Sequence, residues 1–151
     1  MTQNSANLST GSIIVSFASR WRDPINDKNI KVFFRRRGPV RTPKRVLIYL
    51  GSPISSIVAV AEVEKLERID LKAALSMADL GCISEDELRS YIRCDQIVTA
   101  VFLGDQKNFE NPLSITDVRK VMNFHPPQNF IQINDVTLRA LEDLGNAKKI
   151  N

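Results

Sequence analysis

Three consecutive arginines, Arg35 to Arg37, are the residues best suited to chemistry in this sequence. They follow Phe33 and Phe34 directly and precede a Gly-Pro pair. Guanidinium groups bind phosphates in a bidentate manner and stack on bases, while aromatic rings provide stacking surfaces. Such a mixture is typical of a site for single-stranded or looped RNA. Since neighbouring side chains in a strand alternate, at least one phenylalanine must enter the core, and the arginines carry most of this argument.

The charge of the chain is concentrated around these arginines. Residues 20–45 contain 10 of the 21 Lys and Arg residues but only two of the 17 acids, a local net charge of +8 in a chain whose total is +4. The pI of 9.3 is therefore produced by one short segment. A concentrated basic field attracts polyanions, and the alternative is a basic loop that is merely solvated.

Catalytic motifs are sparse. The sequence contains no glycine-rich phosphate loop, no HExxH motif and no GxSxG motif. Its one histidine, His125, lies in a proline-containing loop, NFHPPQNF, where we expect a bystander and not a base. Cys82 and Cys94 lack CxxC spacing, so we expect reduced thiols, no disulfide, no metal and no cofactor.

One pair of carboxylates has a spacing that catalysis can use. Glu62 and Glu64 are two residues apart in a predicted strand and share a face. They would form either a carboxylate pair for acid–base chemistry or a solvated strand end beside Lys65 and Arg68.

The elements that must position the basic segment are mainly strands. Apolar alternation and continuous apolar runs predict strands over residues 12–18, 29–36, 45–51, 56–69, 97–109 and 126–133. In the second strand, Ile30, Val32 and Phe34 are expected on a core face and the basic residues on the other. The third strand is expected to be covered on both faces. The fold class is therefore α+β, mainly β.

Helical periodicity and capping residues predict short helices between and after the strands. They cover residues 71–81 with Gly81 as C-cap, 84–93 with Ser84 as N-cap, 112–121 with Ser114 as N-cap, and 135–150 with Asp135 as N-cap. The helices carry no basic face, so we do not expect a duplex-DNA recognition helix.

The ends of the chain and its hydropathy set the domain limits. We predict a disordered leader over residues 1–11, one domain over 12–133 and a C-terminal helical appendage over 134–151, which a protein partner can bind.

No apolar run approaches the roughly 18–20 residues of a membrane span, and the N-terminus lacks a secretory signal. We therefore expect no membrane contact and a cytoplasmic location.

Five segments, in this order and spacing, resemble the ASCH domain family of the PUA-like superfamily: NIKVFFRRRGP, RVLIYLGSPISSIVAVAEVEKL, GCISEDELRSYI, AVFLGDQKNFENPLSI and HPPQNFIQI. The resemblance covers about residues 12–133. It implies a small β-barrel with peripheral short helices that binds RNA in a cleft beside the barrel. It also implies links to transcription or translation.

The resemblance, together with the basic segment, predicts the nucleic-acid-binding residues. On the basic strand and the following loop they are Lys31, Arg35, Arg36, Arg37, Arg41 and Lys44. Ser52 in the SP turn and Gln128, Asn129 and Phe130 in the closing motif complete the set. Arginines would hold phosphate or stack on a base, Ser52 and Gln128 would read a base edge, and Tyr49 and Phe130 would be cleft walls or core residues.

Some relatives resemble amidohydrolases that act on N4-acetylcytidine through a Lys, a Thr and a Glu. In those members the lysine lies in a Gly-x-Lys-Thr stretch before the basic strand. Here the corresponding stretch reads DKNIKVFF, which places Ile30 at the Lys position and Val32 or Phe33 at the Thr position. Lys28 and Lys31 are only neighbours of that position, although Glu62 matches the acid.

Three functions remain open from the sequence. The first is a non-catalytic RNA-binding module that regulates transcription or translation. The second is a metal-independent hydrolase acting on RNA or a modified nucleoside, amidohydrolase-like or ribonuclease-like, with Lys31, Glu62 and Tyr49 as its chemical groups. The third is a protein-interaction domain that docks through its C-terminal helix. We expect binding and not catalysis.

Overall fold

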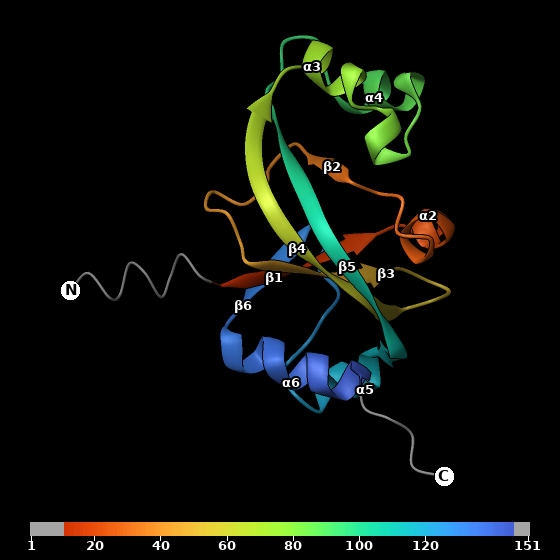
Figure 1. Ribbon diagram of the computed structural model, residues 1–151, viewed down its shortest axis with the longest axis vertical. Helices are drawn as coiled ribbons and strands as arrows, with labels where there is room; N and C mark the ends of the chain where they lie inside the picture. The colour runs from red at the N-terminus through yellow and green to blue at the C-terminus, as the bar shows by residue number, and fades with distance from the viewer. Residues whose placement is uncertain (1–10, 147–151) are drawn as a thin grey trace, which may run out of the picture.

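The computed structural model describes residues 11–146, and the elements follow the chain in an alternation of strands and short helices (Figure 1). Their order is β1 (Ser12–Phe17), η1 (Ser19–Trp21), α2 (Arg22–Asn26), β2 (Val32–Arg35), β3 (Arg45–Leu50), β4 (Ser56–Ile69), α3 (Leu71–Ser76), η2 (Asp79–Gly81), α4 (Glu85–Tyr91), β5 (Val98–Ser114), α5 (Ile115–Arg119), β6 (Phe130–Ile133) and α6 (Asp135–Asn146).

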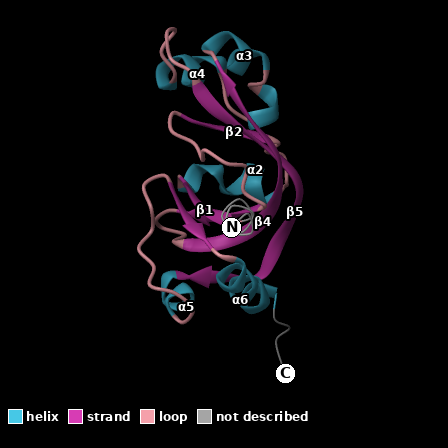
Figure 2. Ribbon diagram, turned by 90° about the vertical axis from the view of Figure 1, so that its left-hand side faces the viewer, coloured by secondary structure: helices cyan, strands magenta, loops and turns pink. Residues whose placement is uncertain are grey.

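The six strands form one mixed sheet that curls into a half-barrel (Figure 2). Their order is β2-β5-β4-β3-β1-β6, in which β1 and β3 are parallel and the other neighbours are antiparallel. The long pair β4 and β5 runs the length of the molecule, and its register shifts at three places. Because a bulge bends a strand and increases its twist, these shifts help the β4–β5 pair to curl.

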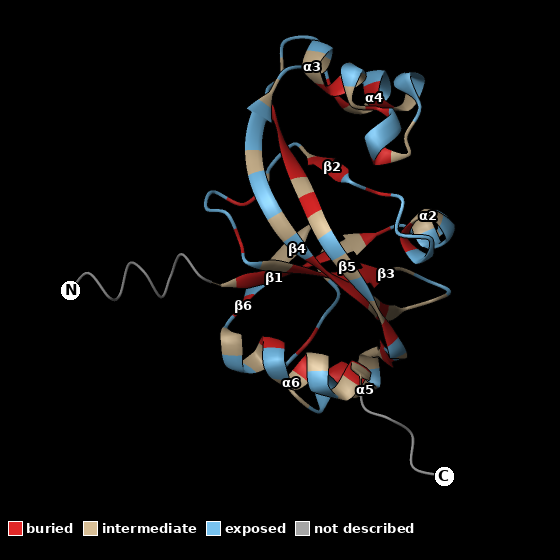
Figure 3. Cartoon of the chain, viewed as in Figure 1, coloured by how far each residue is buried: buried red, intermediate tan, exposed pale blue. Residues whose placement is uncertain are grey.

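Three hydrophobic clusters hold the elements together, and side-chain alternation sorts the residues among them. In β3, Val46, Ile48 and Leu50 face the first cluster together with α2, whereas Leu47 and Tyr49 face the second on the opposite side of the sheet. The second cluster lies against α5 and α6, and a third joins β2 and β5 to α3 and α4. Figure 3 shows the buried residues on the inward sides of these helices.

The half-barrel is open between its edge strands β2 and β6, where ladder pairing ends early. Strand β1 pairs with β6 only as far as Val15. Beyond it, the Ser16 amide donates to the Asn129 carbonyl at 3.0 Å, and the Ser16 carbonyl accepts from an Arg35 side chain at 2.9 Å. Main-chain groups that strands cannot satisfy are thus satisfied by a loop and by an arginine. This opening is where the candidate site lies.

Most predicted elements are confirmed, with four corrections of detail. Strand β2 is largely buried on both faces, since Val32 and Phe34 enter the third cluster and Phe33 the first. Of the expected basic face, only Arg35, beside Phe33, belongs to the strand. Strand β5 continues to Ser114, past the predicted residue 109. Helix α3 ends at Ser76 with Met77 as C-cap, not at Gly81, because a separate 3-10 turn follows.

The fourth correction concerns the C-terminal helix. The N-terminus of the helix is capped by Asn134, whose Oδ1 accepts from the Thr137 amide at 2.8 Å, and not by Asp135. Leu138 and Leu141 are buried in the second cluster, so the helix shares a core with the sheet. The predicted disordered leader, apart from Gly11, lies outside the described residues, as do residues 147–150 of the predicted helix.

Within the described part of the chain, no helix is long and apolar enough to cross a membrane.

Candidate nucleic-acid interface

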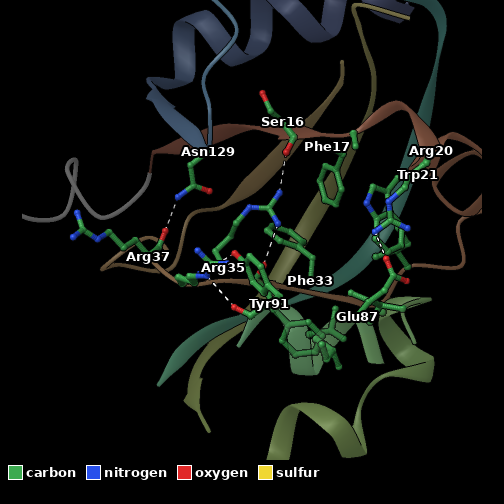
Figure 4. A pocket seen from close by; sticks show the side chains of 18 of the residues that line it. Ser16, Phe17, Arg20, Trp21, Phe33, Arg35, Arg37, Glu87, Tyr91 and Asn129 are labelled. Carbon is green, nitrogen blue, oxygen red and sulfur yellow. Dashed lines mark hydrogen bonds and ion pairs between the residues drawn. The ribbon is translucent and has the colours of Figure 1, made fainter. Parts of the chain in front are cut away.

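A cleft of ≈ 630 Å³ occupies the opening of the half-barrel, between the β1–β2 side and helix α4 (Figure 4). This volume lies within the range of small-ligand sites, about 300–1,000 Å³. Its polar lining residues are Ser16, Arg20, Arg35, Arg36, Arg37, Glu87, Tyr91, Gln128 and Asn129. Its principal apolar lining residues are Phe17, Trp21, Ile30, Val32, Phe33, Phe34, Ile83 and Leu88. We call this space the arginine cleft.

Arg35 lies at the centre of the arginine cleft, at the last position of β2. Its guanidinium carbon is 5.0 Å from the ring centroids of both Phe17 and Phe33, whose rings meet edge to face. One terminal nitrogen donates to the Ser16 carbonyl at 2.9 Å and the other to the Phe34 carbonyl at 3.0 Å. Two strands and two aromatic rings therefore fix this guanidinium in place.

The charge of Arg35 has no carboxylate partner among residues 11–146: both of its hydrogen bonds go to neutral carbonyl oxygens. Burial lowers the pKa of the Arg35 guanidinium, and the nearby Tyr91 hydroxyl opposes that change. An arginine nevertheless remains protonated at neutral pH. A partly desolvated cation without a counter-charge can be stabilised by an anion, because the anion restores the interactions that burial removed.

Arg36 lines the rim and is held by helix α4. Its backbone amide donates to the Tyr91 hydroxyl at 3.1 Å, and its Nε donates to the Tyr91 carbonyl at 2.9 Å. The guanidinium carbon lies 4.4 Å from the Tyr91 ring centroid. The inserted helix thus orients an exposed arginine at the mouth of the cleft.

The turn after β2 sets the direction of Arg37. A Cβ atom at Gly38 would lie 2.5 Å from the Thr99 Cβ, so only glycine allows the chain to pass this close to β5. The Asn129 side-chain amide donates to the Arg37 carbonyl at 2.6 Å, which ties the turn to the loop before β6. The exposed Arg37 guanidinium is left available to a ligand at this end of the cleft.

The loop 125–129 closes that end, and its position depends on two contacts from β1. The Ser16 hydroxyl donates to the Pro127 carbonyl at 2.6 Å, and the Ser16 amide binds Asn129. Gln128 is exposed on the loop, whereas the Asn129 Oδ1 is buried without a hydrogen-bond partner among the described atoms. His125 is exposed and is not a cleft residue.

The predicted binding residues are only partly brought together. Arg35, Arg36, Arg37, Gln128 and Asn129 line the arginine cleft. Five others do not: Lys31, Arg41, Lys44, Ser52 and Phe130. Lys31 is an exposed residue before β2, Arg41 lines a smaller cavity of ≈ 230 Å³, and Ser52 lies in the exposed turn between β3 and β4.

Lys44 and Phe130 each have another role in the structure. The Lys44 ammonium pairs with Asp135 at 3.3 Å and lines a cavity beside α6. Phe130 packs against the first hydrophobic cluster. Neither side chain lines the arginine cleft.

The three candidate catalytic residues are not assembled into one site. Tyr49 is buried in the second cluster, with its ring 5.7 Å from that of Phe124. Glu62 lines the cavity beside α6, whereas Lys31 is exposed just before β2 and lines neither that cavity nor the arginine cleft. At the positions where amidohydrolase relatives carry Lys and Thr, Ile30, Val32 and Phe33 are buried apolar residues.

Sequence reasoning missed the other side of the cleft. Arg20 and Trp21, from η1, lie at the end opposite Arg37 and Asn129 (Figure 4). The Arg20 guanidinium lies 4.4 Å from the Trp21 ring centroid and pairs with Glu87 of α4. The tryptophan between two arginines, Arg20 and Arg22, could have indicated a binding residue from the sequence. Tyr91 and Glu87 belong to α4, and no local sequence pattern shows that this helix packs beside β2.

The described residues contain no cluster of three or more His, Cys, Asp and Glu side chains arranged to hold a metal ion.

The half-barrel with two helices, α3 and α4, between β4 and β5 and a C-terminal helix is the fold of an ASCH protein of known structure. The chain resembles the crystal structure of an ASCH protein from Zymomonas mobilis with a TM-score of 0.80 and 24% identity, over 88% of this chain and 94% of that one. A variant of that protein, with one serine replaced by alanine, matches with a TM-score of 0.81 and 24% identity, over 90% and 97% of the two chains.

A more distant match extends the same fold. The N-terminal domain of McrB from Staphylothermus marinus has a TM-score of 0.62 and 11% identity, over 89% of this chain and 94% of that one. No protein-family model and no curated protein matches the sequence. The chain therefore has the ASCH fold that the sequence resemblance implied, and its function must be argued from its own site.

Proposed function

We propose that this chain is an RNA-binding module that holds single-stranded or looped RNA in the arginine cleft. The observation that carries the proposal is Arg35, a fixed and partly buried cation that faces an open cleft and has no carboxylate partner among the described residues. A phosphate, or the carbonyl edge of a base, would supply the acceptors that the guanidinium lacks. The ASCH fold adds to the proposal by analogy only.

The charge balance of the cleft favours an anionic ligand. Of the residues that the structure describes, four arginines line it, against one carboxylate, Glu87, which is already paired with Arg20. Guanidinium groups spaced along one groove suit a phosphate backbone, because successive phosphates can each meet a fixed donor.

The aromatic lining favours a nucleotide over a simple anion. Trp21 and Tyr91 are half-exposed, whereas Phe17, Phe33 and Phe34 line the cleft as buried residues. Base stacking on aromatic rings contributes about 1–3 kcal/mol per base and tolerates any sequence. A base inside a duplex cannot reach such a cleft, so the ligand would be single-stranded or looped.

The chemical groups of the cleft suit binding more than catalysis. Among its described lining residues, the only carboxylate is engaged by an arginine, and there is no histidine, lysine or cysteine. Such a module would act by occupying an RNA segment, which fits a regulator of transcription or translation. Arg41, on the exposed loop after β2, would contact phosphates outside the cleft.

Replacing Arg36 and Arg37 together by glutamine is expected to weaken binding of a short single-stranded RNA about tenfold at moderate salt, since two rim phosphate contacts are lost. The slope of log affinity against log salt should also become shallower, by about 0.7 per lost contact. Fluorescence anisotropy of a labelled RNA, measured at several salt concentrations, checks both effects.

The matched control replaces Lys72 and Lys107, which are exposed and lie outside the arginine cleft, by glutamine. It also removes two positive charges, and it should change the RNA affinity less than about twofold. If both double variants lost RNA affinity equally, the binding would depend on the total charge of the protein and not on the arginine cleft. If the unmodified protein did not bind RNA, the proposal would be wrong.

A further inference from the structure

We propose that Arg20 is a fourth phosphate-binding arginine of the cleft, and that Glu87 is an internal anion which occupies it until the ligand binds. This inference rests on the proposed function, and it assigns roles to two residues at the end of the cleft opposite Arg37. The ion pair joins the two walls of the cleft, because Arg20 belongs to η1 after β1 and Glu87 belongs to α4 (Figure 4).

The geometry leaves Arg20 correctly placed once the pair is broken. The Arg20 guanidinium carbon lies 4.4 Å from the Trp21 ring centroid, and the Trp21 ring also lines the cleft. Stacking on this ring therefore keeps the cation at the mouth without help from Glu87. The Arg20 and Glu87 side chains remain 56% and 42% exposed, so the pair can open without exposing the core.

Glu87 also has contacts within its own helix, and these remain when its ion pair with Arg20 breaks. It is the third residue of α4, and its backbone amide donates to the Ser84 hydroxyl at 3.0 Å. The Ser84 hydroxyl also lies 3.5 Å from the Glu87 carboxylate. A carboxylate in the first turn of a helix is stabilised by the free amides there, so the Glu87 side chain keeps favourable contacts after it releases Arg20.

A phosphate that enters this end of the cleft meets one attraction and one repulsion. Arg20 draws it in, while the Glu87 carboxylate competes for the same guanidinium and repels the phosphate. An exposed ion pair is worth about 0.2–1 kcal/mol, so a ligand with two or more negative charges can displace it. Because Glu87 is the only carboxylate among the described cleft residues, one substitution removes the competitor.

The test is a double-mutant cycle on the full chain with two probes, a single-stranded RNA oligonucleotide and inorganic pyrophosphate. Glu87→Gln should raise the affinity for both probes about three- to fivefold at low salt, because the competing charge is gone. Arg20→Gln should lower affinity little in the unmodified protein, but should cancel the whole gain in the Glu87→Gln background. Thermal unfolding of each variant checks that the fold persists.

The control is Glu85→Gln, which makes the same chemical change in the same first turn of α4, outside the cleft and paired with Arg89. If Glu85→Gln raises affinity as much as Glu87→Gln, or if Arg20→Gln leaves the gain intact, the inference is wrong while RNA binding stands. If RNA does not bind but pyrophosphate follows the cycle, the inference stands and the proposed function fails. If the effects of Arg20→Gln and Glu87→Gln on affinity are additive with both probes, the inference is wrong.

Discussion

Replacing Arg35 by methionine is expected to weaken RNA binding about 10- to 100-fold while the free energy of unfolding changes by less than about 1 kcal/mol. The loss of affinity follows from the position of Arg35 at the centre of the cleft, where a charge-assisted hydrogen bond to a ligand contributes about 1.5–3 kcal/mol. Anisotropy titrations and urea unfolding measure the two quantities separately.

The small change in stability follows from two opposing effects. Methionine loses the hydrogen bonds to the Ser16 and Phe34 carbonyls, but it also removes a partly desolvated cation that no carboxylate of residues 11–146 compensates. Its thioether can pack against the rings of Phe17 and Phe33, where the guanidinium lay. A residue kept for binding, and not for folding, is expected to behave in this way.

Arg119→Met is the matched control for this substitution. Arg119 also donates to a main-chain carbonyl, that of Phe124 at 2.9 Å, but it lies at α5, away from the cleft. It should lower stability by about 1 kcal/mol and leave RNA affinity unchanged. If Arg35→Met instead retained full RNA affinity, or unfolded the protein, Arg35 would be a structural residue.

Replacing Leu141 by alanine is expected to destabilise the protein by about 2–5 kcal/mol, the usual effect of truncating a buried leucine. Leu141 is fully buried in the second cluster, with Phe124 and Leu113. For a chain of this size, the melting temperature should fall by about 5–15 °C in a thermal unfolding experiment.

Val136→Ala in the same helix is the control, because Val136 is 75% exposed and should change stability by less than about 0.5 kcal/mol. If Leu141→Ala were equally mild, the helix would be a loosely attached appendage, as the sequence alone suggested. Loss of cooperative unfolding with Leu141→Ala would show that the C-terminal helix is part of the domain's core.

The strands could be predicted because their hydrophobic pattern is local. β4 was predicted with its observed limits, Ser56–Ile69, and the continuous apolar run of β3 correctly indicated burial on both faces. Ser84 and Ser114 cap their helices as expected. Each of these features depends on residues within a few positions of one another.

What the sequence did not reveal depends on long-range docking. Val32 and Phe34 are covered by α3 and α4, and Phe33 by the first cluster, so no local alternation could show that both faces of β2 are buried. The arginine triplet marked one side of the cleft. Its other side comes from two segments distant in the sequence: Trp21 follows β1, and Tyr91 ends α4, which packs over β2.

The most direct test of the central claim is a ¹H–¹⁵N NMR titration of the full chain with a short single-stranded RNA. We expect shifts or line broadening at the amides of Arg35, Arg36 and Asn129 and at the Arg35 side-chain Nε, with Lys72 and Arg139 unaffected. Shifts confined to the cavity lined by Glu62, or none at RNA concentrations that saturate the anisotropy signal, would contradict RNA binding in the arginine cleft.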